Sequence, residues 1–238
     1  MTNNIKHIYL KEIRSYFNGP MAYIFLIIFS LVNGYFFSNT FFIFGQSDMR
    51  ALFQIVPLVY LFFIPAITMG IISKEKNIGT MEVMCTLPIK DYEFVIGKYL
   101  AVLTLLKVAL LLTGVMFINL VFVGTNIDYG AVFTGYLGLF LAGAVYASMG
   151  LFASSLTDNQ VVGFIIAIFF VLIFFLIDKL LIFMPNMIAG TLQYLSIDYH
   201  LSNISRGVLD TRNLIYFLSM ISLFIMLTIE SLSSRKWD

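Results

Sequence analysis

Long apolar runs fill most of this sequence, and they constrain its fold more than any other feature. Six can be counted, at about 20–44, 53–72, one ending near Val123, 131–154, 161–184 and 214–232. A helix that spans a membrane needs about 20 such residues, whereas barrel strands alternate over about 10. The chain is 60% hydrophobic and 11% charged, against about 25% charged in soluble domains. The sequence therefore predicts an all-α integral membrane protein with six transmembrane helices.

The charge balance and the few chemistry-bearing residues exclude several classes of function. A net charge of +1 does not indicate the strongly basic surface that nucleic-acid binding requires. The single cysteine, Cys85, can form neither an internal disulfide nor a cysteine metal site. The two histidines, His7 and His200, lie in segments predicted on opposite sides of the membrane. We therefore expect no metal, cofactor or catalytic site in this chain.

A phosphate-binding loop of the Walker type is also missing. The only Gly-Lys pair is Gly97-Lys98. A Walker loop needs Gly where this chain has Tyr92, and Ser or Thr where it has Tyr99. Any ATP hydrolysis must come from a separate polypeptide. The polar start, with no short apolar core and cleavage site, predicts no removable signal peptide.

Basic residues near the span ends predict the orientation, because cytoplasmic ends carry an excess of Lys and Arg. Six spans place both termini on one side. That side would hold Lys6, Lys11, Arg14, Lys74, Lys76, Lys90, Lys98, Arg235 and Lys236. The other would hold Arg50, Arg206 and Arg212, with Lys179 near its edge. We therefore expect a multi-pass membrane protein with both termini in the cytoplasm.

The N-terminal segment, residues 1–19, has an amphipathic pattern typical of a helix lying in the membrane interface. One face carries Ile5, Ile8, Tyr9, Ile13, Tyr16 and Phe17. The other carries Lys6, Lys11, Glu12 and Arg14. Asn18-Gly19-Pro20 then turns the chain into the bilayer. Two interpretations stay open, a plain membrane anchor and an elbow helix that packs beside a cytoplasmic partner.

A charged insert, residues 73–98, separates the second and third spans. Thr80 is predicted to cap a short helix with Glu82 in its first turn, and Pro88 ends this helix. Its apolar side carries Met81, Met84 and Cys85, with Leu87 near the end. Asp91 is predicted to cap the third long helix. The insert is either a docking helix for another protein or a loop that covers the bundle.

Four further features have structural explanations, and for the first two a functional explanation stays open as well. The outer segment, residues 185–212, predicts two short helices that either gate an exit or cap the bundle. Lys107 lies inside the third apolar stretch. It is either a functional residue or a lysine whose side chain extends to the membrane interface, and we favour the second explanation. Asp178 and Lys179 are expected to pair or snorkel. Small residues in the fourth span predict close helix packing: Gly135, Gly138, Ala142, Gly143, Ala144 and Ala147.

The insert motif resembles that of ABC type-2 transporter permeases. The matching positions are Lys74-Glu75-Lys76, Gly79-Thr80-Met81-Glu82, Leu87-Pro88 and Gly97-Lys98. The resemblance covers the whole chain, residues 1–238, as a single transmembrane permease domain. The stretch Ser205 to Asp210 and the C-terminal Ser234-Arg235-Lys236-Trp237 are similar to the gliding-motility branch, which is related to copper-site maturation permeases.

The resemblance implies a role for each matching position. Residues from about Thr80 to Leu87 would form a coupling helix seated on an ATP-binding subunit. The implied ATPase-coupling residues are Lys74, Glu75, Lys76, Gly79, Thr80, Met81, Glu82, Met84, Leu87 and Pro88. The N-terminal helix, with Lys6, Tyr9, Glu12 and Arg14, would be the elbow helix. ATP and Mg would be bound by the partner chain and no cofactor by this one.

Two functions follow from the resemblance. The first is the membrane half of an ATP-driven exporter in a bacterial inner membrane, made with two ATP-binding subunits and a second permease chain, identical or related. The second is a mechanical transmitter that moves no cargo and works with a further subunit carrying a periplasmic domain. Polar residues in the spans are few, so the substrate cannot be read from the sequence.

Overall fold

All regular secondary structure in the described part of the computed structural model, residues 3–43, 48–81, 89–124 and 127–234, is helical. The helices are α1 (Asn3–Asn18), α2 (Pro20–Ser38), η1 (Asn39–Ile43), α3 (Arg50–Thr68), α4 (Ser73–Asn77), α6 (Asp91–Val123), α7 (Tyr129–Ser155), α8 (Gln160–Leu180), η2 (Leu181–Phe183), α9 (Asn186–Gln193), α10 (Ile197–Ser205) and α11 (Thr211–Ser233). The predicted all-α fold is confirmed for this part of the chain.

Among the described residues, six helical segments are long and apolar enough to cross a membrane. They are Pro20–Ile43, Arg50–Asn77, Asp91–Val123, Tyr129–Ser155, Gln160–Leu180 and Thr211–Ser233. Each coincides with one of the apolar runs in the sequence. The third span begins earlier than its most apolar part, because α6 is a single helix of 33 residues. Lys107 therefore lies in the middle of one continuous helix.

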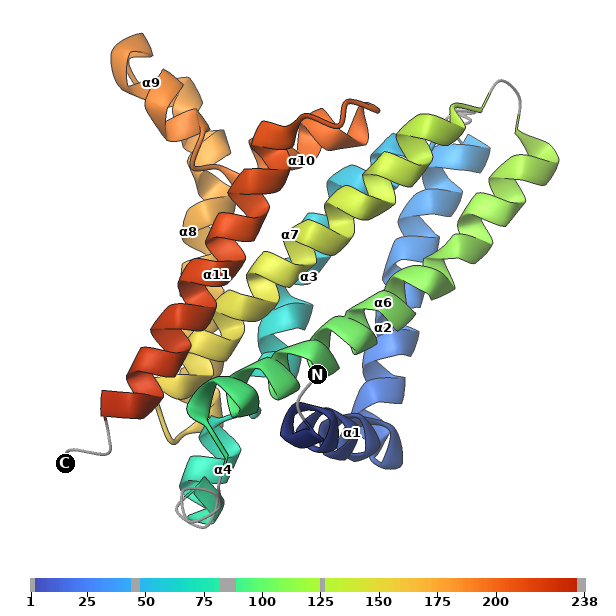
Figure 1. The fold of residues 1–238 in the computed structure, drawn as a ribbon. Helices are drawn as coiled ribbons and strands as arrows, with labels where there is room; N and C mark the ends of the chain where they lie inside the picture. The colour runs from blue at the N-terminus through green and yellow to red at the C-terminus, as the bar shows by residue number, and fades with distance from the viewer. Residues whose placement is uncertain (1–2, 44–47, 82–88, 125–126, 235–238) are drawn as a thin grey trace.

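The two ends of the helix bundle carry different short elements. Figure 1 shows α1 lying across one end, which also carries α4 and, at its far edge, the last turn of α11. The opposite end carries α9 and α10. We call these ends the α1 face and the α10 face. The spans, of which α6 is steeply inclined, connect them (Figure 1).

Helix α7 is the centre of the bundle and the most buried of the six spans. It contacts α3, α6, α8, α10 and α11. Its glycines make this packing possible, because a Cβ at Gly143 would lie 2.6 Å from Leu106 Cδ2 and one at Gly138 would lie 2.9 Å from Leu201 Cδ1. A Cβ at Gly135 would overlap Phe53. The prediction that small residues serve close packing here is confirmed.

The outer segment forms the two predicted short helices, α9 and α10. The apolar side of α10, with Ile197, Leu201 and Ile204, is buried in contact with α7. Lys179 of α8 lies 2.7 Å from Asp198 of α10 and 3.5 Å from Asp178, as the predicted pairing requires. α10 therefore packs on the end of the bundle, and a gating role for this segment stays a prediction.

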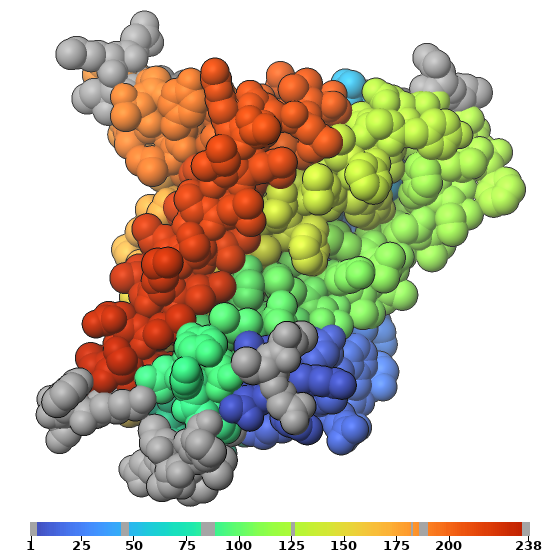
Figure 2. All heavy atoms as spheres, viewed as in Figure 1, coloured from blue at the N-terminus to red at the C-terminus, as the bar shows by residue number. Residues whose placement is uncertain are grey.

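The outward surfaces of the spans are strongly apolar. Figure 2 shows one side of the molecule, where side chains of α6, α7 and α11 lie above α1. Large exposed side chains on the spans include Leu111, Phe122, Phe169 and Leu218. In water such a surface would be unfavourable, but it suits contact with lipid chains.

Candidate functional site

The second span bends between α3 and α4, and the end of α7 stabilises this bend. Ser154 Oγ accepts hydrogen bonds from the backbone N–H groups of Ile72 and Ser73, both at 3.1 Å. It donates to the carbonyl of Met69 at 2.8 Å. Ser154 is buried, so it satisfies backbone groups that water cannot reach. The position of α4 is therefore fixed by α7.

The helix starts in the insert differ from the sequence prediction. Gly79 adopts a left-handed conformation with φ of 74°, which glycine tolerates best. Thr80 is already helical, and its hydroxyl donates to the carbonyl of Glu75 at 3.1 Å. This bond connects Thr80 back to α4. Asp91 is likewise the first residue of α6 rather than its cap, and Glu93 Oε2 accepts from the N–H of Lys90 at 3.2 Å.

A buried ionic cluster joins the insert to α1 and α6 on the α1 face. Lys98 of α6 has a side chain only 1% exposed, and its Nζ lies 2.9 Å from Glu12 Oε1 and 2.9 Å from Glu75 Oε2. The same ammonium donates to the carbonyl of Ile71 at 2.8 Å. Lys11 Nζ lies 2.9 Å from Glu75 Oε1 on the more exposed side. We call Lys11, Glu12, Glu75 and Lys98 the Lys98 cluster.

The charges of the Lys98 cluster balance, which explains how an ammonium can be buried here. Two lysines face two glutamates, so the cluster is neutral when all four groups are ionised. Burying an unpaired charge is costly, and burying one with opposite charges and further acceptors is much less so. The ring of Phe94, 4.8 Å from Lys98 Nζ, adds a cation–π contact. Such a cluster contributes mainly a specific geometry between α1, α4 and α6.

Helix α1 is seated directly on the first turns of α6. A Cβ at Gly97 would lie 2.8 Å from Ile8 Cγ2, so glycine is needed for this close approach. Tyr9 shares a hydrogen bond of 3.0 Å with Thr104, and Asn4 donates to Glu93 at 3.0 Å. The amphipathic pattern predicts Glu12 on the polar face with Lys6 and Arg14. In the structure Glu12 turns towards Lys98, because α1 packs on α6 along part of its polar side.

The other predicted coupling residues spread over both sides of the insert. Lys74 is exposed, and Lys76 Nζ donates to the carbonyl of Ser155 at the end of α7. Met81 is half-buried against the core. Lys6 and Arg14 of α1 are exposed. The predicted positions Glu82, Met84, Leu87 and Pro88 lie outside the described residues.

A cleft of about 400 Å³ lies beside the Lys98 cluster. It is bounded by α1, α4 and the bend after α3, and Gln160 at the start of α8 reaches it. Tyr16 lines it, and its hydroxyl donates to the carbonyl of Ile67 at 3.5 Å. Burial, with a smaller effect of the Glu12 carboxylate, raises the pKa of Tyr16 above its ordinary value. Tyr16 therefore stays uncharged and acts as a packing and hydrogen-bonding group.

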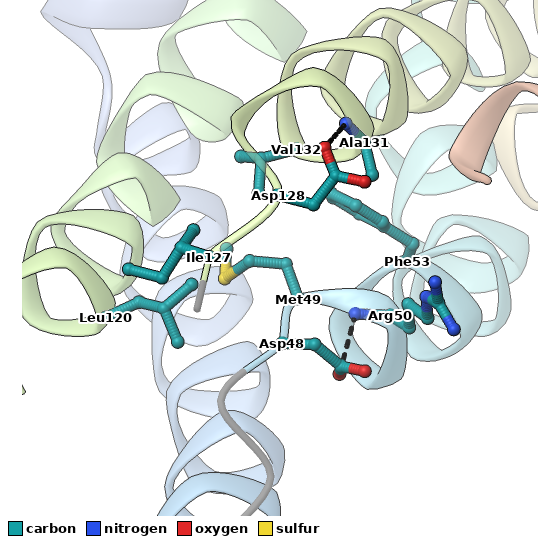
Figure 3. A pocket seen from close by; sticks show the side chains of 9 residues that line it. All are labelled: Asp48, Met49, Arg50, Phe53, Leu120, Ile127, Asp128, Ala131 and Val132. Atoms are coloured by element: carbon teal, nitrogen blue, oxygen red, sulfur yellow. Dashed lines mark hydrogen bonds between the residues drawn. The ribbon is translucent and has the colours of Figure 1, made fainter. Parts of the chain in front are cut away.

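On the α10 face, a pocket of about 230 Å³ lies between the start of α3, the end of α6 and the start of α7 (Figure 3). Its two carboxylates have structural partners. Asp48 Oδ1 accepts from the N–H of Arg50 at 3.2 Å, and Asp128 Oδ1 accepts from the N–H of Ala131 at 3.1 Å. Both therefore stabilise helix N-termini, and neither is arranged for acid–base catalysis.

The described residues form no metal-binding cluster, and the buried histidine of the α10 face has structural partners. Among the described residues, no three His, Cys, Asp or Glu side chains lie close enough to hold a metal ion. His200 is buried, with its ring nitrogens 2.7 Å from Asn213 Oδ1 and 3.0 Å from the Tyr194 carbonyl. It stacks on Tyr216 with ring centroids 4.0 Å apart. These contacts hold α10 against α11.

Sequence reasoning missed the role of Lys98, of Lys11 and of Ser154. From the sequence, Lys98 is a positive charge near a span end and part of a Gly-Lys pair, and neither feature predicts a buried ion pair. A signal was present, because Lys98 is flanked by Val95, Ile96 and Tyr99 in a stretch that is otherwise apolar. Ser154 gave no signal, because a serine near a helix end is common and its partners lie on another span.

Comparison with known proteins agrees with this architecture. The model of the family described as ABC-2 family transporter protein matches residues 31–237, which is most of the chain. A search of curated proteins found no match. The match covers all but part of the first of the six candidate spans, together with the α4 insert and the short helices of the α10 face. This chain is thus a multi-pass membrane permease subunit of an ABC transporter and belongs to the ABC-2 family of transporter proteins.

Proposed function

We propose that this permease couples ATP hydrolysis by a separate ATP-binding subunit to export or conformational work across a bacterial inner membrane. The family implies an ATP-binding partner, and the insert around α4 is the surface that we assign to it. The observation that carries the proposal is the Lys98 cluster. It links α4 to both α1 and α6 through side chains that are largely shielded from solvent.

The cluster supports coupling because it resists separation of the elements it joins. Removing one partner from a buried ion pair typically costs about 3–5 kcal/mol, so α4 cannot move away from Lys98 without a large penalty. A push on the insert would therefore move α1 and the start of α6 with it. Helix α6 has 33 residues, about 50 Å at 1.5 Å per residue, and would carry this motion towards the α10 face.

The docking surface would combine exposed apolar and basic side chains of the insert. Ile78, directly after α4, is 61% exposed. Lys74 is exposed beside it. An apolar side chain next to a basic one suits a groove with an acidic rim on a partner. The family resemblance adds Met84 and Leu87 to this surface as predictions.

The proposed assembly has two ATP-binding subunits and two permease chains, the second identical or related. ATP and Mg would lie in the partner. Both termini would be cytoplasmic, because most basic residues near the span ends gather on the α1 face. Membership of the gliding-motility branch, and mechanical transmission to a periplasmic subunit without cargo, remain predictions from the sequence resemblance.

The test is purification of the tagged full chain from its native membrane, with identification of its partners and measurement of ATPase activity. We expect Ile78→Asp, and separately Met81→Asp with Met84→Asp and Leu87→Asp, to lose the ATP-binding subunit while the chain stays in the membrane. Val208→Asp with Leu209→Asp is the control, because these residues are exposed on the α10 face.

Full retention of ATPase association by both insert variants would refute the assignment of the docking surface. A complex that also contains a subunit with a periplasmic domain, and that takes up no cargo, would favour mechanical transmission over export.

A further inference from the structure

Lys107 is the central residue of α6, and its charge has no counterpart in the described structure. α6 runs from Asp91 to Val123, so Lys107 is equally far from both ends. The side chain is exposed, and no ion pair or hydrogen bond joins it to another described residue. Thr104, one turn earlier in α6, shares a hydrogen bond with Tyr9 of α1, the predicted interface helix. Lys107 therefore lies within about one turn of the level where lipid head groups are expected, and its charge needs a partner or water there.

The exposed lysine lies at an apolar groove of about 420 Å³ between α6 and α7. The groove is lined by Lys107, Leu110, Leu111, Gly114, Phe133, Tyr136, Leu137 and Phe140. Apart from the ammonium, the polar group here is the Tyr136 hydroxyl, which accepts a hydrogen bond from Thr113 at 3.3 Å. The size and composition match ligand sites, which typically measure about 300–1,000 Å³ and are mainly apolar with a few polar groups.

Gly114 keeps part of this groove open. A Cβ added at Gly114 would have no neighbouring atom within 4 Å. Most glycines of α7 are needed for close packing, but this glycine of α6 borders empty space. An acyl chain could therefore lie against the α6 backbone at this point.

The sequence shows that a second copy of the chain cannot supply the missing negative charge. Of its 13 acidic residues, none lies in the middle of an apolar span. The two that come nearest, Asp178 and Glu230, lie within the last turn of α8 and α11. A counter-charge for Lys107 would therefore come from a molecule other than this chain, and lipid is the molecule that the bilayer brings to this exposed side of α6.

We infer that the groove between α6 and α7 binds an anionic phospholipid, with its head group at Lys107 and an acyl chain along Gly114, Phe133 and Leu137. An anionic lipid provides both the charge that Lys107 lacks and the apolar chain that the groove fits. The inference requires a bilayer but not the ATP-binding subunit, so it is independent of the proposed coupling function.

The experiment uses the full chain in phosphatidylcholine vesicles that contain a fixed fraction of a brominated lipid, which quenches tryptophan fluorescence on contact. The single native tryptophan is removed as Trp237→Phe, and Phe133→Trp places a probe in the groove. Phe169→Trp on α8 is the matched control probe, because Phe169 is also well exposed on a span, at 62% against 71% for Phe133.

We expect brominated phosphatidylglycerol to associate about five-fold more strongly than brominated phosphatidylcholine at the Phe133→Trp probe, the preference that one lysine near anionic lipid provides. The preference should disappear in Lys107→Gln, persist in Lys107→Arg, and be absent at the Phe169→Trp probe. Gly114→Leu should fill the groove and reduce quenching by both lipids at the first probe only.

Three results would overturn the inference. Equal quenching by the two lipids would show that the site does not select charge. A preference that survives Lys107→Gln would assign it to another residue. A probe shielded from both lipids would show that protein, not lipid, covers the groove.

Discussion

At the scale of single residues, Lys98 is the position where burial and charge matter most. It is almost fully buried, and three oxygens from α1, α4 and the preceding bend surround its ammonium. We expect Lys98→Met to lower the free energy of unfolding in mixed micelles by about 3 kcal/mol, because it leaves two carboxylates without their buried partner.

The control for this prediction is Lys90→Met at the exposed position directly before the same helix, where surface substitutions change stability by about 0.5 kcal/mol. Adding Glu12→Gln and Glu75→Gln to Lys98→Met should recover much of the loss. Equal stability of Lys98→Met and Lys90→Met would contradict the role of the cluster.

Ser154 is the second residue whose substitution should lower stability, although its side chain is small. Ser154→Ala removes the acceptor for two buried N–H groups, and we expect a loss of about 2 kcal/mol in the same unfolding measurement. Ser222→Ala is the control, since Ser222 is exposed and donates to a carbonyl of its own helix. A loss no larger than that of the control would mean that the bend finds other partners.

At the scale of elements, two glycines of neighbouring helices should respond oppositely to the same methyl group. A Cβ at Gly150 of α7 would overlap the buried Thr68 of α3, whereas one at Gly114 of α6 meets open space. We expect Gly150→Ala to destabilise by about 1–3 kcal/mol through overpacking. Gly114→Ala should be neutral or stabilise by up to about 1 kcal/mol.

Thermal unfolding of the two variants side by side is the measurement. A loss at Gly114→Ala as large as that at Gly150→Ala would show that glycine is needed in these helices for reasons other than close packing.

At the scale of the whole molecule, the uneven distribution of basic residues predicts its orientation. In a Cys85→Ser background, we expect Lys6→Cys on α1 and Arg212→Cys on α11 to react with an impermeant maleimide from opposite sides of sealed vesicles. Lys6→Cys should react from the cytoplasmic side, together with the control Lys90→Cys. Labelling of Lys6→Cys and Arg212→Cys from the same side would contradict the six-span arrangement.

The sequence by itself determined the elements of this protein. Apolar runs of about 20 residues have no stable alternative to spanning helices, because every backbone group in lipid must be hydrogen-bonded within its own segment. The helical spacing of apolar residues predicted α1. The mixture of apolar and polar residues between the fifth and sixth spans predicted α9 and α10. The sequence places Lys76, Gly79 and Thr80 in the insert, but it does not predict which residues they contact.

Tertiary structure decided which of these residues work together. Glu12 and Lys98 are separated by 86 positions, and Ile72 and Ser154 by 82. Periodicity places a side chain on a face of its own helix but does not say which face of another helix it meets. That choice depends on how all the helices pack at once, as the inward turn of Glu12 shows. The Lys98 cluster exists because Gly97 lets α1 lie close enough to α6 for their charges to meet.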